Sequence, residues 1–143
     1  IDKLVNMLVF NYENEELEVT VNYRHVETVK AEDMINNIKE ASKPFEIEVE
    51  GISPILFYPK DHPLITTLLN VYQEETGDYE TQIIASGGGT YAKEADNVVA
   101  FGMEYPGHDP RMHGVNENTK REYLVESMGI YAHAIVDLGN LIK

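Results

Sequence analysis

His113 is the first residue of this sequence that could do chemistry, because it lies in the glycine-flanked loop Met112-His113-Gly114 ahead of an expected terminal helix. Neutral imidazole is the commonest metal ligand, and a loop next to a rigid helix can hold it in a fixed orientation. One histidine alone does not hold zinc, and the sequence contains no His-Glu-x-x-His or Cys-x-x-Cys spacing. On its own, the pattern is more typical of an exposed loop residue.

The glycines Gly87, Gly88 and Gly89 follow a short apolar stretch, residues 81–85, that reads as a strand. Glycines allow the backbone to approach a ligand closely and to point its N–H groups at an anion. The triplet matches neither the P-loop nor the dinucleotide-binding fingerprint. A tight turn is therefore the alternative interpretation, and by itself the more common one.

Arg24 stands at the end of the polar face of an expected strand, residues 17–23. Its guanidinium could clamp a carboxylate through two parallel hydrogen bonds. A solvated arginine on a strand face is the commoner outcome. The other four histidines share no metal-ligand spacing, and we expect them to be structural or exposed.

The charge of the chain excludes several classes of partner. With 25 acidic and 11 basic residues, its formal net charge is −14, which repels phosphate backbones and anionic membrane surfaces. We therefore expect no nucleic-acid partner and no membrane partner. The absence of cysteine excludes disulfides and thiolate metal sites. No signal or transmembrane segment is recognisable, and the expected location is cytoplasmic.

The first third of the sequence predicts a small α+β unit. Apolar residues alternate with polar ones over residues 17–23 and 45–49, which is the period of half-buried strands. The apolar run at residues 7–10 is expected to pair with the first of these strands through a hairpin connection at residues 11–16. Between the two alternating segments, Met34, Ile35 and Ile38 share one helical face, which predicts a helix that covers the sheet.

The remainder follows a proline- and glycine-containing connector at residues 51–60. A helix is expected from an N-cap at Asp61 to Gly77, with strands at residues 81–85 and 97–102 and a loop at residues 105–114. A last helix begins near Thr119. Its expected core-facing stripe has alternating spacings of four and three, and consists of Leu124, Met128, Tyr131, Ile135 and Leu138.

Five segments taken together resemble the C-terminal portion of the dinuclear-zinc aminoacylase/carboxypeptidase-type metallopeptidases, and specifically the PepV-type dipeptidases. They occur in that family's order and span most of the chain, which makes the set far more specific than any one member. The segments are Val19-Thr20-Val21-Asn22-Tyr23-Arg24, Tyr58-Pro59-Lys60-Asp61-His62-Pro63-Leu64, Gly87-Gly88-Gly89-Thr90-Tyr91-Ala92-Lys93, Asn97-Val98-Val99-Ala100-Phe101-Gly102 and His113-Gly114-Val115-Asn116-Glu117.

The resemblance implies an α+β fragment that combines part of a ferredoxin-like lid sheet with the closing segment of a zinc-peptidase catalytic domain. Residues 1–53 would be the C-terminal part of the lid, and residues 54–143 the C-terminal segment of the catalytic domain. It further implies that His113 is a zinc ligand, that Arg24 grips the carboxylate of a dipeptide substrate, and that the loop of Gly87, Gly88 and Gly89 contacts the same end. Asn116 and Glu117 would support the ligand or its loop through outer hydrogen bonds.

In the family, two zinc ions activate a water and polarise the scissile carbonyl while a glutamate shuttles protons. The other ligands come from a His-x-Asp motif, a bridging Asp, a Glu-Glu pair and a further acidic residue, all ahead of the lid. This sequence has no His-x-Asp, and its Glu74-Glu75 pair falls at the wrong place in the order. We therefore expect the chain alone to bind zinc weakly and to hydrolyse nothing, and its missing N-terminal part to be its partner. A smaller departure is His25-Val26, where the family usually has an aromatic residue and then proline.

Two other functions stay open at this point. One is a binding or regulatory module that reuses the lid-like sheet without chemistry. The other is an amidase or deacylase of the same family, because the scaffold also serves acylated amino acids. Self-association of the chain through apolar surface is open as well.

Overall fold

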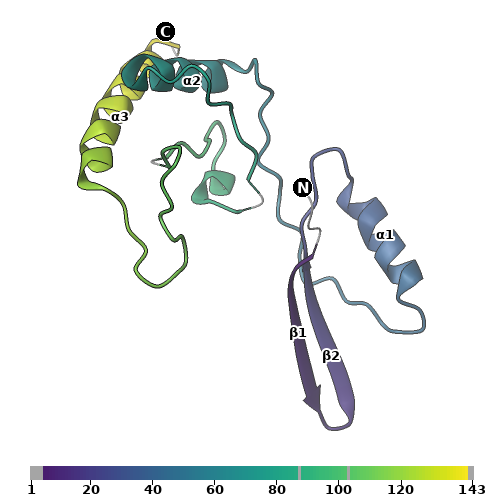
Figure 1. Cartoon of the computed structure of the whole chain (residues 1–143). Coiled ribbons are helices and arrows are strands. Elements are labelled where there is room, and N and C mark those ends of the chain that lie inside the picture. The colour runs from purple at the N-terminus through teal and green to yellow at the C-terminus, as the bar shows by residue number, and fades with distance from the viewer. Residues whose placement is uncertain (1–4, 87, 103, 142–143) are drawn as a thin grey trace. The chain divides into compact units, whose positions relative to one another are not determined.

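The computed structural model describes residues 5–86, 88–102 and 104–141, and its fold is α+β (Figure 1). A two-stranded antiparallel sheet precedes three α-helices and one short 3₁₀ helix. The elements are β1 (Val5–Glu13), β2 (Glu16–Tyr23), α1 (Ala31–Ala41), α2 (Pro63–Thr76), η1 (Tyr91–Glu94) and α3 (Arg121–Leu141). The backbone falls into two compact units. The first comprises Ile1–Phe57 and Ser86–Gly89, and the second comprises Tyr58–Ala85 and Thr90–Lys143.

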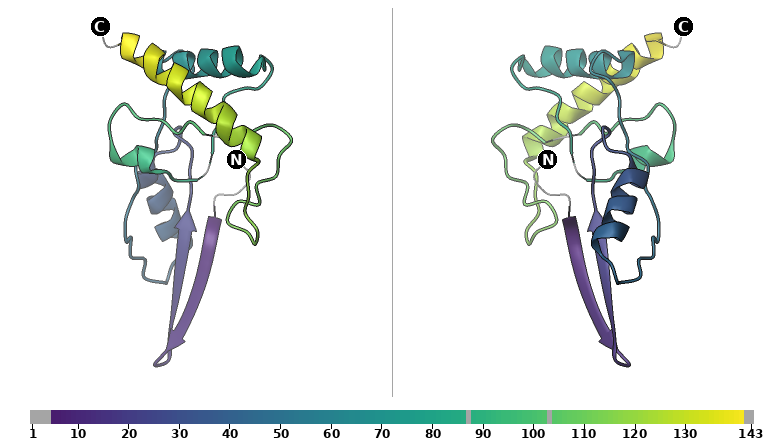
Figure 2. Two further views of the ribbon diagram at one scale, coloured as in Figure 1. Left: turned by 90° about the vertical axis from the view of Figure 1, so that its left-hand side faces the viewer. Right: turned by 90° about the vertical axis from the view of Figure 1, so that its right-hand side faces the viewer.

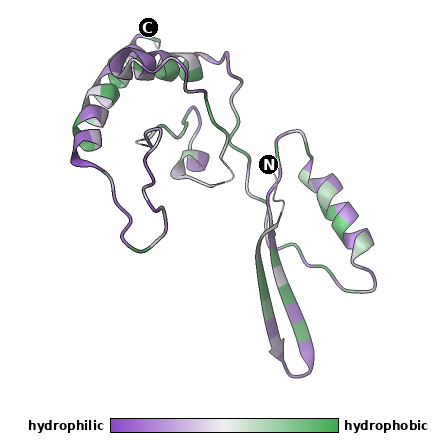
Figure 3. Cartoon of the chain, in the orientation of Figure 1, coloured by the Kyte–Doolittle hydropathy of each residue, from purple (hydrophilic) through white to green (hydrophobic). Residues whose placement is uncertain are grey.

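Strands β1 and β2 confirm the predicted hairpin, although the connection is shorter than expected. Pairing continues to Glu13 and Glu16, which leaves only Asn14 and Glu15 as the loop, with φ of 52° and 70°. Two central residues with positive φ match the turn geometry that suits the twist of paired strands. Apolar and polar residues alternate along β2, whereas β1 contains the continuous apolar run Met7 to Phe10 (Figure 3). One face pairs Leu8 with Val21, Phe10 with Val19, and Tyr12 with Leu17.

Helix α1 forms where it was predicted, but it does not cover the sheet. Among the described elements, contacts occur between β1 and β2 and between α2 and α3, and α1 packs on neither strand. The predicted strand at residues 45–49 is wrong as well, because no described segment pairs with it and Phe45 is 77% exposed. A strand needs a neighbour for its N–H and C=O groups, and alternation in the sequence does not supply one.

Helix α2 begins one residue later than its predicted cap. His62, not Asp61, is the N-cap, and its Nδ1 accepts a hydrogen bond of 3.2 Å from the backbone N–H of Leu64. Pro63 occupies the first turn, where a missing N–H costs nothing. The helix ends as predicted at Gly77, whose φ of 69° places it in the left-handed region that glycine adopts easily.

The core of the second unit lies between α2 and α3, which lie against each other in every view (Figures 1 and 2). Leu68, Val71, Ile130 and Ala134 form a buried cluster, in which Val71 is completely inaccessible. Residues 81–85 and 97–102 were predicted as strands, and both predictions are wrong because no strand pairs with either segment in the described structure. The second segment nevertheless packs on the cluster through Val99 and Phe101.

The predicted core stripe of α3 is only partly correct. Met128 and Ile135 are 71% and 72% exposed, whereas the small residues Ser127 and Ala134 are buried beside Ile130. Apolar residues occupy two sides of this helix, and the side with small residues allows α2 to approach. No helix in the described parts of the chain is long and apolar enough to cross a membrane.

Candidate functional site

The loop at residues 110–118 presents His113 in an unusual backbone conformation. Arg111, His113 and Asn116 all have positive φ, of 53°, 60° and 62°. Positive φ is uncommon for residues with a side chain, although Asn and His adopt it more readily than Arg, and such conformations cluster at active sites and ligand clamps. Three positive-φ residues within six positions give this loop the highest density of such conformations in the described part of the second unit.

Backbone hydrogen bonds close the loop on itself. The N–H of Gly114 donates to the carbonyl of Arg111 at 2.7 Å, and the N–H of Asn118 donates to the carbonyl of Pro110 at 3.0 Å. A Cβ at position 114 would lie 2.9 Å from the Arg111 carbonyl oxygen, so only glycine fits this approach. His113 is thus held at the tip of a short closed turn rather than in an open connection.

The chain enters this loop through a tight turn at residues 105–108. The N–H of His108 donates to the carbonyl of Tyr105, with Pro106 and Gly107 between them and a φ of 79° at Gly107. Proline followed by a glycine of positive φ is the signature of a type II turn. Asp109 then accepts the backbone N–H of Arg111 through its Oδ1 at 2.9 Å, which fixes the start of the His113 loop.

Tyr123, in the first turn of α3, ties both ends of the loop to the helix. The ring of Tyr105 stacks on it with centroids 4.3 Å apart, and the ring of His108 meets it edge-on at 5.3 Å. From the other end, the Nζ of Lys120 donates to the Tyr123 hydroxyl and lies 4.9 Å from the ring centroid. The hydrogen bond to Tyr123 is the main cause that raises the pKa of Lys120. Since α3 packs on α2, this contact connects the His113 loop to the core.

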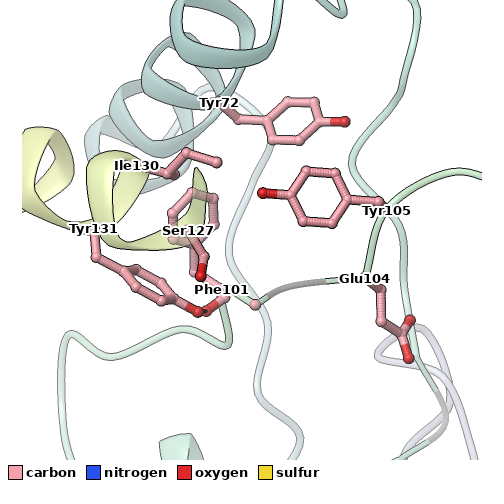
Figure 4. Close-up of a pocket in the computed structure, with 8 residues that line it drawn as sticks. Tyr72, Phe101, Glu104, Tyr105, Ser127, Ile130 and Tyr131 are labelled. Atoms are coloured by element: carbon pink, nitrogen blue, oxygen red, sulfur yellow. Dashed lines mark hydrogen bonds between the residues drawn. The ribbon is translucent and has the colours of Figure 1, made fainter. Parts of the chain in front are cut away.

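A small pocket lies beside this anchor, between α2, α3 and the segment that leads into the turn (Figure 4). The ring of Tyr105 points into it, whereas the carboxylate of Glu104 points away. The Tyr105 hydroxyl is shielded from solvent and has no hydrogen-bond partner among the described residues. Burial, and secondly the charge of nearby Glu126, raise the pKa of Tyr105. The lining residues are Tyr72, Phe101, Gly102, Glu104, Tyr105, Ser127, Ile130 and Tyr131.

The predicted supporting residues lie in the same loop as His113. Asn116 and Glu117 are both exposed, as is His113 itself. The carbonyl of Asn116 accepts a hydrogen bond of 2.9 Å from the side-chain amide of Asn118. The contribution of Asn116 in this structure is therefore to the shape of the loop.

The predicted substrate-binding residues belong to the first unit. Arg24 directly follows β2 and is half-buried, and the neighbouring His25 points its Nδ1 at the carbonyl of Val26. In the glycine loop, the N–H of Gly88 donates to the Ser86 hydroxyl at 3.1 Å, and Gly89 is exposed. Gly87 lies outside the described residues. The structure thus groups the predicted residues into two sets, one in each unit.

Zinc requires more ligands than these residues supply. Within residues 5–86, 88–102 and 104–141, no group of three or more His, Asp or Glu side chains could hold a metal ion. The predicted metal ligand, His113, is a single exposed imidazole, which does not make a complete zinc site, and we derive no catalytic step through a metal.

Sequence reasoning missed the residues that position the loop. Tyr-Pro-Gly-His at residues 105–108 is a legible type II turn signal, and it could have been found. The stacking on Tyr123 joins residues that are far apart in the chain, and no local pattern signals it.

The chain is similar to several curated proteins over most of its own length. A Staphylococcus epidermidis protein named "Putative dipeptidase" is 32% identical over 140 residues, which are 96% of this chain and 30% of that protein. "Putative dipeptidase YtjP" of Bacillus subtilis is 33% identical over 121 residues, which are 85% of this chain and 26% of that protein. A Staphylococcus aureus protein that carries the same kind of name is 29% identical over 140 residues, again 96% of this chain and 30% of the relative.

The chain therefore spans about a third or less of the length of the relatives it matches. No protein-family model matches it. No solved structure matches it either.

Proposed function

We propose that this chain is the C-terminal part of a zinc-dependent dipeptidase of the PepV type, and that His113 is one of the zinc ligands. The remaining ligands and the general base would come from sequence that precedes the lid. Arg24 would bind the free carboxylate of the dipeptide, and Gly87, Gly88 and Gly89 would contact the same end. The chain alone would be inactive.

The observation that carries this proposal is the closed loop that displays His113. It combines three left-handed residues, a glycine that admits no side chain, and an aromatic anchor to α3. An ordinary surface histidine needs none of these, whereas a metal ligand gains from a fixed orientation. The similarity to proteins named as putative dipeptidases also supports a peptidase function.

The residues present define what each would contribute when zinc is bound. Zinc would supply Lewis-acid activation of water and of the scissile carbonyl. The imidazole of His113 would occupy one coordination position of the zinc ion. The contacts of Tyr123 with Tyr105, His108 and Lys120 would restrict the movement of the loop. Arg24 would orient the substrate through its planar fork.

The test of the metal role uses the full-length protein with His113→Asn. Asparagine tolerates positive φ, so this change removes the imidazole and leaves the backbone preference in place. We expect loss of a bound zinc ion by elemental analysis, and a fall in dipeptide hydrolysis beyond the roughly 10–100-fold typical of outer-shell changes.

Arg111→Asn is the matched control, because Arg111 is another exposed left-handed residue of the same loop. It should leave zinc content and turnover near those of the parent protein. Full zinc content and activity in His113→Asn would remove His113 from the site. A natural protein that consisted of these 143 residues alone would remove the whole enzyme proposal.

The test of substrate binding compares Arg24→Lys and Arg24→Gln on dipeptides with free and amidated C-termini. Arg24→Gln should raise KM mainly for the free carboxylate, and Arg24→Lys should restore part of the loss because it keeps the charge without the fork. An unchanged preference for the free carboxylate would exclude Arg24. Faster hydrolysis of N-acyl amino acids than of dipeptides would replace the proposal by an amidase or deacylase.

A further inference from the structure

Helix α3 carries a second apolar side that nothing in the described structure covers. This α3 outer face consists of Leu124, Val125, Met128, Ile135 and Val136, whose exposed fractions are 44%, 62%, 71%, 72% and 61%. At 100° per residue these positions share one half of the helix, apart from the side that packs on α2. The charged residues Glu122, Glu126 and Asp137 lie elsewhere around the helix, and Arg121 stands at the N-terminal end of the strip. The outer face is therefore a continuous apolar strip on a helix that is already anchored on its opposite side.

The chain as a whole exposes more surface than closed domains of its mass would. Two separate closed domains of about 8 kDa each would expose about 9,000 Å² together by the mass scaling of folded proteins. The chain exposes 11802 Å². The excess is about 2,800 Å², and exposed apolar side chains in both units contribute to it.

One kind of partner fits this face poorly. An anionic membrane would be repelled by the net charge of −14, and no described helix could span it. The relatives have about 70% of their length outside the matched region, which is enough polypeptide to cover the α3 outer face.

We propose that the α3 outer face is the surface on which the rest of the same polypeptide packs, the part that corresponds to the unmatched length of the relatives. The partner presents an apolar, uncharged face of a helix layer or sheet. This inference rests on the proposed function. It adds that α3 links two surfaces, with the His113 loop at its N-terminal turn and the remainder of the protein along its outer face.

Methionine oxidation can test this surface directly. Met128 should react readily with hydrogen peroxide in the 143-residue chain and be strongly protected in the full-length protein, as read by peptide mass spectrometry. Met128→Glu and Ile135→Glu should lower the yield of soluble full-length protein. Asn70→Glu is the matched control, because it adds the same charge at an exposed position of α2, and it should have little effect.

The outcomes separate this inference from the proposed function. Protected Met128 in a full-length protein without peptidase activity would support the surface and overturn the function. An active full-length protein with freely reactive Met128 would support the function and overturn the proposed surface. If the 143-residue chain forms a stoichiometric dimer in sedimentation analysis, with Met128 protected, and Met128→Glu makes it monomeric, the partner is a second copy and the inference is wrong.

Discussion

Both units of this chain contain amphipathic elements, but in the described structure only one of them contains buried side chains. All the buried side chains in the described structure belong to the second unit, mostly where α2 meets α3. In the first unit, the hairpin and α1 each have an apolar face, and these faces do not meet. A sequence pattern therefore creates a face, whereas a core forms only where two faces come into contact.

The hairpin has an apolar face that no other element covers in the described structure. Phe10, Tyr12 and Leu17 are 63%, 70% and 62% exposed, although they share one side of the sheet. An isolated two-stranded hairpin is marginally stable in water and normally needs a further layer. The second unit has that layer for α2, because Ser127 and Ala134 let α3 approach it closely.

The largest expected difference between the units comes from shortening one leucine in each. Leu68 is 7% exposed and lies in the α2–α3 cluster. Leu68→Ala should lower the free energy of unfolding by about 2–4 kcal/mol, because it removes buried methyl groups and leaves a cavity. Urea unfolding followed by helical circular dichroism measures this loss.

Leu17→Ala is the counterpart in the first unit. Its side chain is largely exposed, so the free energy of unfolding should change by less than about 0.5 kcal/mol. Equal losses in both variants would show that the hairpin face is covered in solution, and the contrast between the units would fail.

The same contrast explains what the sequence could and could not predict. The hairpin and the three helices were predictable because their periodicities, end signals and glycine stop are local. The segments at 45–49, 81–85 and 97–102 have strand-like composition, but a strand exists only with a partner, and no local pattern provides one. The inner side of α3 was misjudged because large apolar residues were favoured over Ser127 and Ala134.

The candidate site divides in the same way. His113 and the glycine at 114 were legible from the sequence, since a glycine-flanked histidine before a helix is a local signal. The anchoring of the loop on Tyr123, and the left-handed backbone at Arg111 and Asn116, depend on how the loop closes in three dimensions. Similarly, His62 instead of Asp61 caps α2, because the choice between two adjacent polar residues depends on backbone geometry.

A smaller effect is expected from adding one methyl group to a glycine in each unit. A Cβ at Gly77 or at Gly51 would meet no atom within 4 Å, so packing does not distinguish them. Gly77 has a φ of 69°, however, and Gly77→Ala should cost about 1–2 kcal/mol from backbone strain alone. Gly51→Ala should leave the free energy of unfolding unchanged, or raise it by up to about 1 kcal/mol by restricting the unfolded chain. A loss at Gly51 as large as that at Gly77 would contradict this interpretation.

Finally, the α2–α3 contact contains a histidine that lies close to three carboxylates. No such group is found among the described residues of the first unit. The Nδ1 of His133 lies 2.7 Å from Glu75 Oε1, and its Nε2 lies 3.4 Å from an Asp137 oxygen and 3.8 Å from a Glu74 oxygen. The hydrogen bond to Glu75 is the main cause that raises the pKa of His133. A protonated His133 would therefore join the two helices that support the core.

The smallest predicted effect is a pH dependence of stability that His133→Gln removes. Because the folded pKa of His133 is raised, its contribution is fully present below the unfolded pKa of about 6.5, and it is lost as pH rises through the folded value. The free energy of unfolding of the parent should therefore exceed that of His133→Gln near pH 5, and the difference should shrink toward pH 8. Urea titrations of both proteins across this range measure it. The carboxylates titrate in both proteins, so the subtraction largely cancels their background, and a difference that is constant with pH would show that His133 contributes packing rather than charge.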